Sequence, residues 1–531
     1  MKRFIPHPSP IFFLLFLFTF HFSPNTSVAQ DIDISNGNVF DGEPYIAVNP
    51  TNTQNMVIAW MGFVFNSGTG LTIKVKSSFN GGATWSNAVN MPHLRPTFKS
   101  ADVSMTFDAS GNLFLSYIDY RQSPDSGGVY VCKSTNGGLN WSAPVLAIDG
   151  LSDGNKLPID RPWIAVNNAG DKIFVTSKPP SWVSPPNRPY MAHSENGGAN
   201  FFPWRYIDTT GFLVGNILAQ PMPAPAYSGN NFFVMYPSYL PSQSIYPKYI
   251  LASSSNNGAS FAYYTAIASN ICTANGGADS AKLGYKLLTD PSNQNHLGFI
   301  FPCGSTDFDI YFIESFDAGV NWTSPVRVND DAVNNGVMQD MMWGDFDLNG
   351  DLVITWRDRR NAAGTGYATA SEFYAAFRCH DSANFFPNFH LSDSLVAYNN
   401  ILSQSGNDFM GVCLRNDTLS AAWGSTRDGS LDIWFTRMKA TNGCVSNVSL
   451  VSSESQFISV FPNPSDGKST VRTNSGDAIE KIIVSDMSGK KIMEKKYFST
   501  EANIDLTELP HGIFLLTVFS EGKSFTQKII H

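Results

Sequence analysis

Short apolar runs separated by polar turns fill the chain from about residue 40 to about residue 440. Residues 113–117 and 352–356 are two of these runs, and each follows a turn built from Gly, Asn and Ser or Asp. Runs of about 4–8 apolar residues between such turns are typical of β-strands joined by hairpins. Phe, Trp, Tyr, Gly and Asn, which favour strands and tight turns, are abundant. The pattern predicts an all-β fold.

A similar local sequence recurs at the start of successive units. Residues 44–49 are Pro-Tyr-Ile-Ala-Val-Asn, and residues 162–167 are Pro-Trp-Ile-Ala-Val-Asn. Related starts lie near residues 44, 102, 161, 222, 283, 342 and 408, so a unit is about 60 residues long. This length suits a four-stranded propeller blade with generous loops. We therefore expect a β-propeller of seven blades, with six blades as the alternative.

A hairpin motif, Ser-x-Asp/Asn-x-Gly-x-x-Trp/Phe, recurs with the same period, and a decayed sixth copy lies at residues 380–386. The Ser and Asp or Asn side chains can bond turn amides, and Gly can adopt the backbone that the turn needs. The Trp or Phe can fill space between blades. The five clear copies, called the repeat hairpins below, contain Ser78, Asn80, Gly82 and Trp85; Ser134, Asn136, Gly138 and Trp141; Ser194, Asn196, Gly198 and Phe201; Ser254, Asn256, Gly258 and Phe261; and Ser315, Asp317, Gly319 and Trp322.

The repeat hairpins resemble the Asp box, also called the BNR repeat, of sialidases and related propellers. In that family the boxes are structural and lie away from the catalytic face, and a typical sialidase has six blades. The resemblance therefore implies a scaffold and leaves activity open. Two classes of function remain: a glycan-directed protein, either carbohydrate-binding or a divergent glycoside hydrolase, and a non-catalytic adhesion or interaction protein.

The last part of the chain has a different sequence character. Its marker segments are Val-Phe-Pro-Asn-Pro at 460–464, Ile-Val-Ser-Asp-Met-Ser-Gly-Lys at 483–490, Ile-Asp-Leu at 504–506, the run at 509–518 and Gln-Lys-Ile-Ile at 527–530. In this order they resemble the type A C-terminal sorting domain of the type IX secretion system. Alternating apolar and polar positions fit a small β-sandwich. The resemblance implies that the type IX machinery is a partner of residues 457–531.

The first residues are typical of an export signal. Lys2 and Arg3 precede an apolar run at 11–22, and Ser27-Val28-Ala29 offers small residues for cleavage before Gln30. The run is shorter than the ~20 residues that span a bilayer. The expected domains are a signal peptide at 1–29, a propeller at 30–445, a linker at 446–456 and the sorting domain at 457–531. We expect a secreted or outer cell-surface protein that passes through the periplasm and has no transmembrane segment after signal cleavage.

The net charge of −9, without a cluster of Lys and Arg, argues against nucleic acid as a partner. Six cysteines occur without a CxxC pair, which argues against a zinc site. Export makes disulfides feasible. Cys272 with Cys303 and Cys413 with Cys444 are the predicted pairs, and buried free thiols are the alternative.

Residues 345–350 look like the opening of a calcium-binding EF-hand loop. The twelfth position is Trp356, which cannot supply the carboxylate that such a loop requires. A plain turn is therefore predicted. No cofactor and no metal are expected, and a structural cation such as calcium has no support in the sequence.

Sialidase chemistry requires several specific residues. A sialidase resembling the known families needs three arginines on the sugar carboxylate, a Tyr nucleophile activated by a Glu, and an Asp acid/base. The family's Arg-Ile-Pro segment is missing, and only four Glu residues lie between 31 and 450: Glu43, Glu195, Glu314 and Glu372. The catalytic candidates are Glu372, Tyr374 and Asp160. We expect a propeller that lacks typical sialidase catalysis, with a divergent exo-sialidase or glycoside hydrolase as the alternative.

Charged residues recur at equivalent places in several units. The starts of the innermost strands carry Glu43, Asp102, Asp160, Asp340 and Asp408, and we expect these acids to form a ring near the central channel, with arginines among them. The ring could grip a polar ligand such as a glycan or hold a cation, or the charges could pair and lock blade to blade. The second reading is favoured. The candidate ligand-binding residues are Arg121, Arg161, Arg360, Arg427, Asp102, Asp119 and Asp358.

Overall fold

The computed structural model describes residues 30–37, 39–64, 70–122, 125–150, 160–178, 188–208, 223–238, 248–267, 284–304, 307–400, 407–440, 444, 458–474, 476–486, 490–521 and 523–531. The chain divides into two compact units, Met1–Thr441 and Asn442–His531. The predicted signal peptide at 1–29 and the predicted linker at 446–456 lie outside the described residues. In the described part of the chain, no helix is long and apolar enough to cross a membrane.

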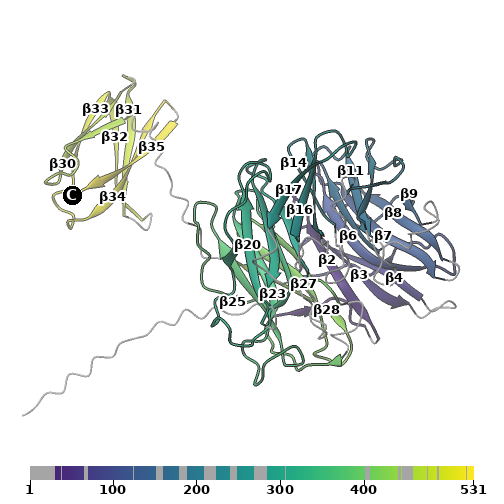
Figure 1. The fold of residues 1–531 in the computed structure, drawn as a ribbon. Helices are drawn as coiled ribbons and strands as arrows, with labels where there is room; N and C mark the ends of the chain where they lie inside the picture. The colour runs from purple at the N-terminus through teal and green to yellow at the C-terminus, as the bar shows by residue number, and fades with distance from the viewer. Residues whose placement is uncertain are drawn as a thin grey trace, which may run out of the picture. The chain divides into compact units, whose positions relative to one another are not determined.

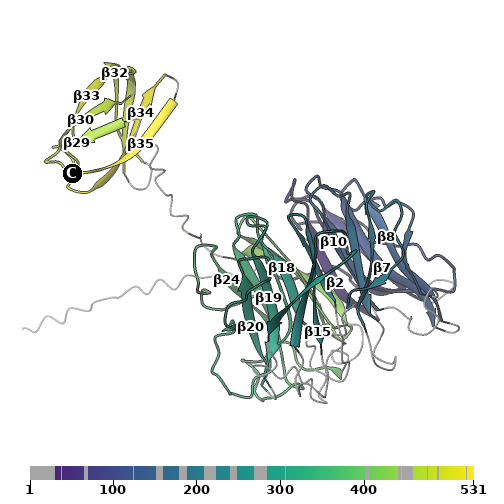
Figure 2. The ribbon, with the colours of Figure 1, turned by 45° about the horizontal axis from the view of Figure 1, so that its top comes forward.

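The described strands of the first unit form seven four-stranded antiparallel sheets, which are the blades of a propeller (Figures 1 and 2). The prediction of seven blades is confirmed, and the alternative of six is wrong. In blades 1 to 6 the strands follow one another in chain order from the innermost to the outermost. Neighbouring strands are joined by hairpins, as the apolar runs and turns predicted.

The strands of blades 1 to 4 have the following bounds: β2 (Asp41–Val48), β3 (Met56–Val64), β4 (Gly70–Ser78) and β5 (Val89–Asn90); β6 (Lys99–Phe107), β7 (Leu113–Gln122), β8 (Asp125–Ser134) and β9 (Val145–Asp149); β10 (Asp160–Val166), β11 (Ile173–Lys178), β12 (Tyr190–Ser194) and β13 (Arg205–Tyr206); β14 (Ala224–Ser228), β15 (Asn231–Ser238), β16 (Lys248–Ser254) and β17 (Ala262–Ile267). Blades 5 and 6 consist of β18 (Lys286–Thr289), β19 (Leu297–Cys303), β20 (Asp309–Ser315) and β21 (Val326–Arg327); β22 (Asp340–Phe346), β23 (Leu352–Asp358), β24 (Glu372–Arg378) and β25 (Phe389–His390).

Blade 7 is built from both ends of the propeller chain. Its inner strands are β26 (Gly411–Arg415), β27 (Thr418–Ser425) and β28 (Asp432–Lys439), and its outermost strand is β1 (Ile32–Asp33). Ile32 pairs with Phe435 and Asp33 with Trp434. The N-terminal strand thereby closes the ring, since β28 and β1 belong to opposite ends of the propeller sequence.

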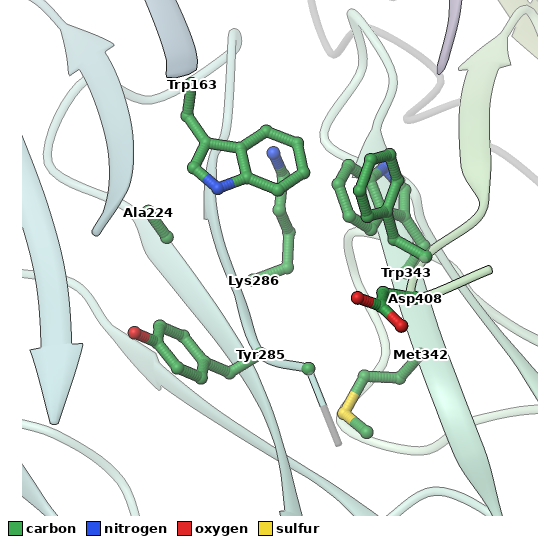
Figure 3. A pocket seen from close by; sticks show the side chains of 9 residues that line it. Trp163, Ala224, Tyr285, Lys286, Met342, Trp343 and Asp408 are labelled. Atoms are coloured by element: carbon green, nitrogen blue, oxygen red, sulfur yellow. The ribbon is translucent and has the colours of Figure 1, made fainter. Parts of the chain in front are cut away.

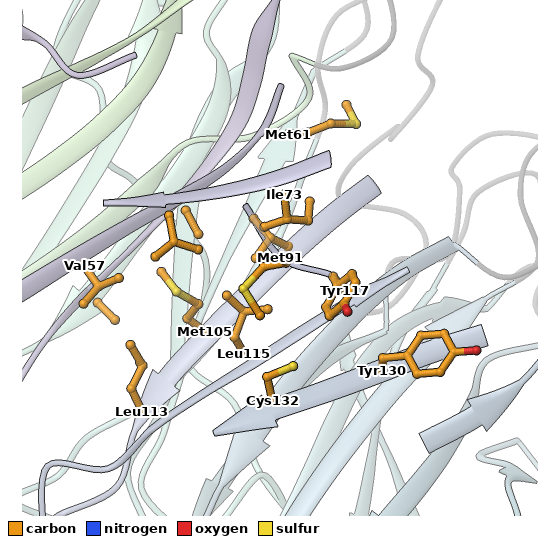
Figure 4. Close-up of a cluster of buried hydrophobic side chains, with 14 residues drawn as sticks. Val57, Met61, Ile73, Met91, Met105, Leu113, Leu115, Tyr117, Tyr130 and Cys132 are labelled. Atoms are coloured by element: carbon orange, nitrogen blue, oxygen red, sulfur yellow. The ribbon is translucent and has the colours of Figure 1, made fainter. Parts of the chain in front are cut away.

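Apolar side chains from neighbouring blades interlock to form the core. Between blades 1 and 2, Val57 and Ile73 pack with Met105, Leu113 and Leu115, all of which are buried (Figure 4). These residues are the apolar members of the runs that predicted the strands. Burial of such side chains, at roughly 1.5–3 kcal/mol each, is the main stabilising force in each interblade layer.

The repeat hairpins have the same hydrogen bonds in all five copies. The Ser Oγ accepts a hydrogen bond from the Gly amide at 2.8–3.0 Å. The same Oγ donates to the Asn or Asp Oδ1 at 2.9–3.0 Å. The Gly has a φ between 75° and 91°, which a residue with a Cβ adopts only with strain. The segment at 380–386 differs, because there Ser382 bonds only to the backbone of Asn384.

The cysteines differ from one of the two predicted pairings. Cys132 and Cys413 are free and buried, whereas Cys303, Cys379 and Cys444 are disulfide-bonded. The sulfur atoms of Cys379 and Cys444 lie within 4.8 Å of one another. The predicted Cys413–Cys444 pair is therefore wrong, since Cys413 lies inside the β26–β27 hairpin and packs in the core between blades 7 and 1. Cys272 lies outside the described residues, so its pairing with Cys303 stays a prediction.

The second unit is a β-sandwich of two sheets. One sheet contains β29 (Ile458–Phe461), β30 (Lys468–Thr473) and β33 (Glu501–Asp505), and the other contains β32 (Lys491–Ser499), β31 (Ile479–Ser485), β34 (Ile513–Ser520) and β35 (Lys523–Ile530). Every second residue of β34 is buried, as the alternating sequence predicted. Val471 and Ile504 of the first sheet share one core with Ile482, Leu516 and Val518 of the second.

Candidate functional site

Four innermost strands carry a bulge near the centre of the propeller. In β2, β6, β10 and β22 the pairing with the neighbouring strand shifts register at this point. The bulged residue has a positive φ in each strand: 53° at Glu43, 47° at Asp102, 56° at Arg161 and 52° at Met341. A bulge re-aims the side chain that it carries, and a positive φ is uncommon outside glycine. The shared bulge brings three charged side chains to a common point.

Six charged residues meet there, and we call them the central cluster. Its members are Glu43, Asp102, Asp160, Arg161, Lys178 and Asp408. Arg161 Nη1 lies 3.3 Å from Glu43 Oε1 and 3.7 Å from Asp102 Oδ1, and its Nη2 donates to Asp408. Lys178 Nζ donates to Asp160 Oδ2 at 2.6 Å. One guanidinium from blade 3 thus joins acids of blades 1 and 2 and of the segment that leads into blade 7.

Burial controls the ionisation of this cluster. It raises the pKa of Asp102 to about 6, with a further rise from the charge of Glu43. It also raises the pKa of Asp160 to about 6 and that of Glu43 above its usual range. The neighbouring acids hold the pKa of Arg161 far above its ordinary value despite its burial. Because four acids face two bases, some of the carboxyl groups of the cluster stay protonated in mildly acidic solution.

A layer of aromatic rings around one lysine fills the centre beside this cluster. Lys286 Nζ of blade 5 lies 4.4 Å from the ring centroid of Trp343, 5.6 Å from that of Trp163 and 5.8 Å from that of Tyr45. Phe409 packs 5.0 Å from Trp163 and lies under the Arg161 guanidinium at 5.4 Å. Figure 3 shows Lys286 reaching between Trp163 and Trp343, with Asp408 nearby.

This layer leaves little free space. The pocket lined by Trp163, Lys286, Trp343, Asp408 and Phe409 has a cavity volume of about 20 Å³, enough for about one water molecule. Contacts between an ammonium group and aromatic faces are favourable by about 0.5–2 kcal/mol. Rings and a lysine from five blades therefore fill this part of the described centre. Asp408, which lines the pocket, is partly exposed, and we call this edge of the centre the mouth.

Three of the four candidate arginines lie outside the central cluster. Arg427 donates to Asp31 and Asp393, each at 2.7 Å, and so ties the N-terminal segment to blade 7. Arg360 donates to Asp330 Oδ1 at 2.6 Å and to Asp358 Oδ2 at 3.0 Å.

Arg121 is exposed and makes no ion pair within the described part of the chain. Of the four candidate arginines, only Arg161 therefore lies among the acids of the described centre, where all four had been expected.

Two candidate acids and one acid of the expected ring are buried in local networks. Asp358 accepts from Trp356 Nε1 at 2.7 Å as well as from Arg360. Asp340 accepts two hydrogen bonds from Arg357, at 2.7 and 2.5 Å, and two from Arg359, at 3.2 and 3.4 Å.

Asp119 accepts from Ser100 Oγ at 3.0 Å, and the same carboxylate oxygen lies 2.7 Å from His93 Nδ1. Ser100 Oγ also lies 3.2 Å from His93 Nδ1, the ring nitrogen that faces Asp119. A Ser-His-Asp triad places the serine and the carboxylate at opposite ring nitrogens, so this geometry does not match one.

The candidate pair Glu372 and Tyr374 shares one face of β24 and is joined by a histidine. Tyr374 Oη lies 3.0 Å from His390 Nε2, and His390 Nδ1 lies 3.1 Å from Glu372 Oε2. Asn361 Nδ2 donates to Glu372 Oε1 at 2.7 Å and to Tyr374 Oη at 2.9 Å. Burial, then the charge of Glu372, raises the pKa of Tyr374, which disfavours a phenolate nucleophile. The third catalytic candidate, Asp160, lies in the central cluster and not beside this pair.

Several residues at the centre and beside Glu372 and Tyr374 had no sequence motif of their own. Lys178 and Lys286 are single lysines within apolar strands, and their partners lie in other strands or blades. His390 follows a Phe-rich segment with no motif. Lys286 could have been noticed because it immediately follows Tyr285, at the start of the fifth unit.

Comparison with known proteins identifies the C-terminal unit. Residues 459–531 match the family described as secretion system C-terminal sorting domain. No curated protein matches the sequence. A Dyadobacter fermentans protein of unknown function matches with 12% identity over 77% of this chain and 97% of its own, at a TM-score of 0.43.

Two further solved structures resemble the chain. The Hadza microbial sialidase Hz136 shows 11% identity over 70% of this chain and 73% of its own, at a TM-score of 0.40. A Penicillium chrysogenum α-L-arabinanase shows 10% identity over 78% of this chain and 98% of its own, at 0.45. These values are too low to argue for an activity. The protein is a β-propeller whose C-terminal sorting domain directs it through the type IX secretion system to the outer cell surface or beyond.

Proposed function

We propose that this protein is a secreted or cell-surface propeller that binds an extracellular glycan or surface protein and lacks typical sialidase catalysis. The observation that carries the proposal is the commitment of Arg161 to Glu43, Asp102 and Asp408. A sialidase site needs several arginines free to grip the carboxylate of the sugar. At the described centre, the one arginine is occupied by the protein's own acids.

The charge at the mouth indicates the kind of ligand. Four carboxyl groups face two cations in the central cluster, so an anionic sugar such as a sialoside would meet repulsion. A neutral or cationic glycan would be tolerated, with the partly exposed Asp408 able to accept hydrogen bonds from sugar hydroxyls. The resemblance of the repeat hairpins to those of glycan-directed propellers favours a glycan over a protein ligand.

A divergent glycoside hydrolase is the second candidate, and one observation favours it. Asp102 and Asp160 have pKa values of about 6, raised first by burial, while Asp408 accepts from Arg161 nearby. One protonated and one ionised carboxyl group form the pair that glycoside hydrolysis uses. Such an enzyme would act on neutral glycosides, since the arginines needed for sialic acid are paired.

Binding can be tested with residues 30–531 of the chain, labelled and applied to an array of neutral, cationic and sialylated glycans. We expect retention on neutral or cationic glycans only, reduced at least about tenfold by Asp408→Asn, a loss of roughly 1.4 kcal/mol. Asp381→Asn, an exposed acid in the decayed hairpin, is the matched control and should bind normally. Equal binding by both variants would remove the mouth as the ligand site. Turnover of a fluorogenic neutral glycoside would favour the hydrolase instead.

A further inference from the structure

The hairpins that join the first two strands of each blade contact one another around the propeller. At three described junctions, an Asn or Asp side chain of one blade is covered by a glycine of the next blade's hairpin. These pairs are Asn49 with Gly111, Asp108 with Gly170, and Asp290 with Gly350. A Cβ on any of these glycines would lie 3.0 Å or less from the facing side chain. Each of these contacts therefore requires glycine, which has no side chain to clash with the facing Asn or Asp.

The junction between blades 6 and 7 has no such glycine. Asp347 occupies the place of Asp108 and Asp290, but the hairpin of blade 7 has Asn416 and Asp417, both with positive φ, where glycine would be expected. As a result, carboxylate oxygens of Asp347, Asp351 and Asp417 all lie within 4.8 Å of one another. The Asp417 carboxylate thus lies where the three junctions described above have a glycine.

The hairpin of blade 6 also differs in the side chain that faces Asp347: Asp351 takes the place of a hydrogen-bond donor. Asp108 Oδ2 accepts from Asn112 Nδ2 at 2.7 Å, and Asp290 Oδ2 lies 2.8 Å from His296 Nδ1. Asp351 stands four residues after Asp347, as Asn112 stands after Asp108, and an ionised carboxylate has no proton to donate.

Asp347 Oδ1 receives the amides of Asn349 and Asp351 at 2.8 and 3.1 Å. Its Oδ2 is buried and receives no hydrogen bond from any described residue, although the whole side chain is inaccessible to solvent. Asp347 therefore lies beside the carboxylates of Asp351 and Asp417, whereas Asp108 lies beside the Asn112 amide and Gly170.

Two nearby cations, His380 and Arg415, attract Asp347 through space, but each bonds to another carboxylate. His380 Nδ1 lies 2.8 Å from Asp351 Oδ1, and Arg415 Nη1 donates to Asp345 Oδ2 at 2.7 Å. Among the described residues, neither group bonds to Asp347 Oδ2. A buried carboxylate oxygen without a hydrogen-bonded partner is costly, so a cation bound between these acids would stabilise the junction.

We propose that Asp347, Asp351 and Asp417 hold a divalent cation, Ca²⁺ by preference, which joins blade 6 to blade 7. The three side chains offer only oxygen, which hard cations select, and Ca²⁺ accepts six to eight such ligands in flexible geometry. Asp417 is partly exposed, so water can complete the shell. Cys379 and Cys444 lie close to Asp351 but are disulfide-bonded and supply no ligand. The plain hairpin predicted for residues 345–350 is present, and the third acid comes from the next blade.

The test uses residues 30–531, freed of metal by EDTA, with calorimetric Ca²⁺ titration and thermal unfolding. Extracellular calcium modules bind with dissociation constants of about 10⁻⁴–10⁻³ M. We expect a binding isotherm in that range and a rise in Tm of about 2–4 °C in 5 mM CaCl₂. Asp417→Asn should abolish both responses. Asp428→Asn, an exposed acid in the other hairpin of blade 7, is the matched control and should retain them.

A second variant keeps the proposal falsifiable if Asp417→Asn folds poorly. Asp351→Asn recreates the Asp108–Asn112 arrangement, so it should raise the Tm of the metal-free protein and remove the response to Ca²⁺. The proposal is overturned if the wild-type chain shows no heat and no Tm change up to 10 mM Ca²⁺, which is about tenfold above the weakest dissociation constant typical of extracellular calcium modules. It is also overturned if Asp417→Asn responds as the wild type does.

Discussion

The repeat hairpins and the central cluster are held together in opposite ways. Each hairpin closes on itself through the same Ser–Gly and Ser–Asn or Ser–Asp bonds, within eight residues and in five blades. The central cluster occurs once, and Arg161 collects acids that lie 59, 118 and 247 residues away in the chain. The first region builds blades, whereas the second fixes the blades to one another.

The difference shows where function can reside in such a repeat protein. Five identical hairpins cannot make one asymmetric site, and their bonds are all internal. The centre is asymmetric, but its arginine and its lysines are engaged by the protein's own acids and rings. We therefore assign the proposed binding to the exposed edge of the cluster, where Asp408 lies.

The largest effect is expected from Arg161→Met. The substitution leaves three acids around the centre without their shared cation, and breaking a buried ion pair in this way costs about 3–5 kcal/mol. Chemical denaturation measures the free energy of unfolding. Arg121→Met, which removes an exposed arginine without an ion pair in the described structure, should change it by less than about 0.5 kcal/mol. Equal effects of the two variants would show that the cluster does not hold the blades together.

The next effect is on the pH dependence of stability. The folded chain keeps Asp102 and Asp160 protonated up to a pKa of about 6, whereas the unfolded chain releases these protons near pH 4. Between these values the folded state binds more protons, so the free energy of unfolding falls as pH rises. We expect the protein to be on the order of 2 kcal/mol more stable at pH 5 than at pH 7.5.

The variant Asp102→Asn should weaken this dependence without abolishing it, because Asp160 still retains a proton in the folded chain, as does Asp31, whose pKa burial raises to about 7. The opposite trend below about pH 4 comes from Glu314 and Asp393, whose pKa values are lowered to about 2 despite burial. His296 and Arg378 lower the pKa of Glu314, and hydrogen bonds with Asp31 and Ser394 lower that of Asp393. Thermal unfolding across pH 3–8 gives both slopes. Stability that rises steadily to pH 7.5 in the wild type would contradict the assigned protonation of the centre.

The repeat hairpins should respond more weakly and uniformly. Replacing Ser78, Ser134, Ser194, Ser254 or Ser315 by Ala removes one buried hydroxyl that bonds the Gly amide, at a cost of about 1–2 kcal/mol each. Ser382→Ala, in the decayed copy, should cost less because it bonds only to an exposed turn. A wide spread among the five single variants would show that the hairpins are not equivalent.

The smallest effect is expected from Lys286→Met. Methionine fills similar space between Trp163 and Trp343 but removes the ammonium contact, which contributes about 0.5–1 kcal/mol. The tryptophan emission should shift, while the free energy of unfolding changes little. A loss of several kcal/mol would mean that the lysine carries charge balance as well as packing.

The sequence predicted the local features of the fold better than the site. The unit starts, the repeat hairpins and the sorting domain follow from short stretches whose structure is determined within each stretch. The acids near the centre were also predicted, because they recur at equivalent places in the units.

Their partners were not predicted, because pairing depends on blade geometry. Lys178, Lys286 and Asp417 each act through residues of another strand or blade, and no spacing along the chain reveals such contacts. The bulge that aims Arg161 inward also depends on strand register, which the sequence pattern leaves open.

Turnover of a fluorogenic sialoside tests the central claim most directly. Residues 30–531 would be assayed between pH 5 and 7.5, with a known sialidase as the positive control. Because Arg161 is occupied by the protein's own acids, we predict no turnover above the buffer rate. Turnover that disappears in Arg161→Lys, while that variant remains folded, would contradict the account and assign the arginine to a substrate.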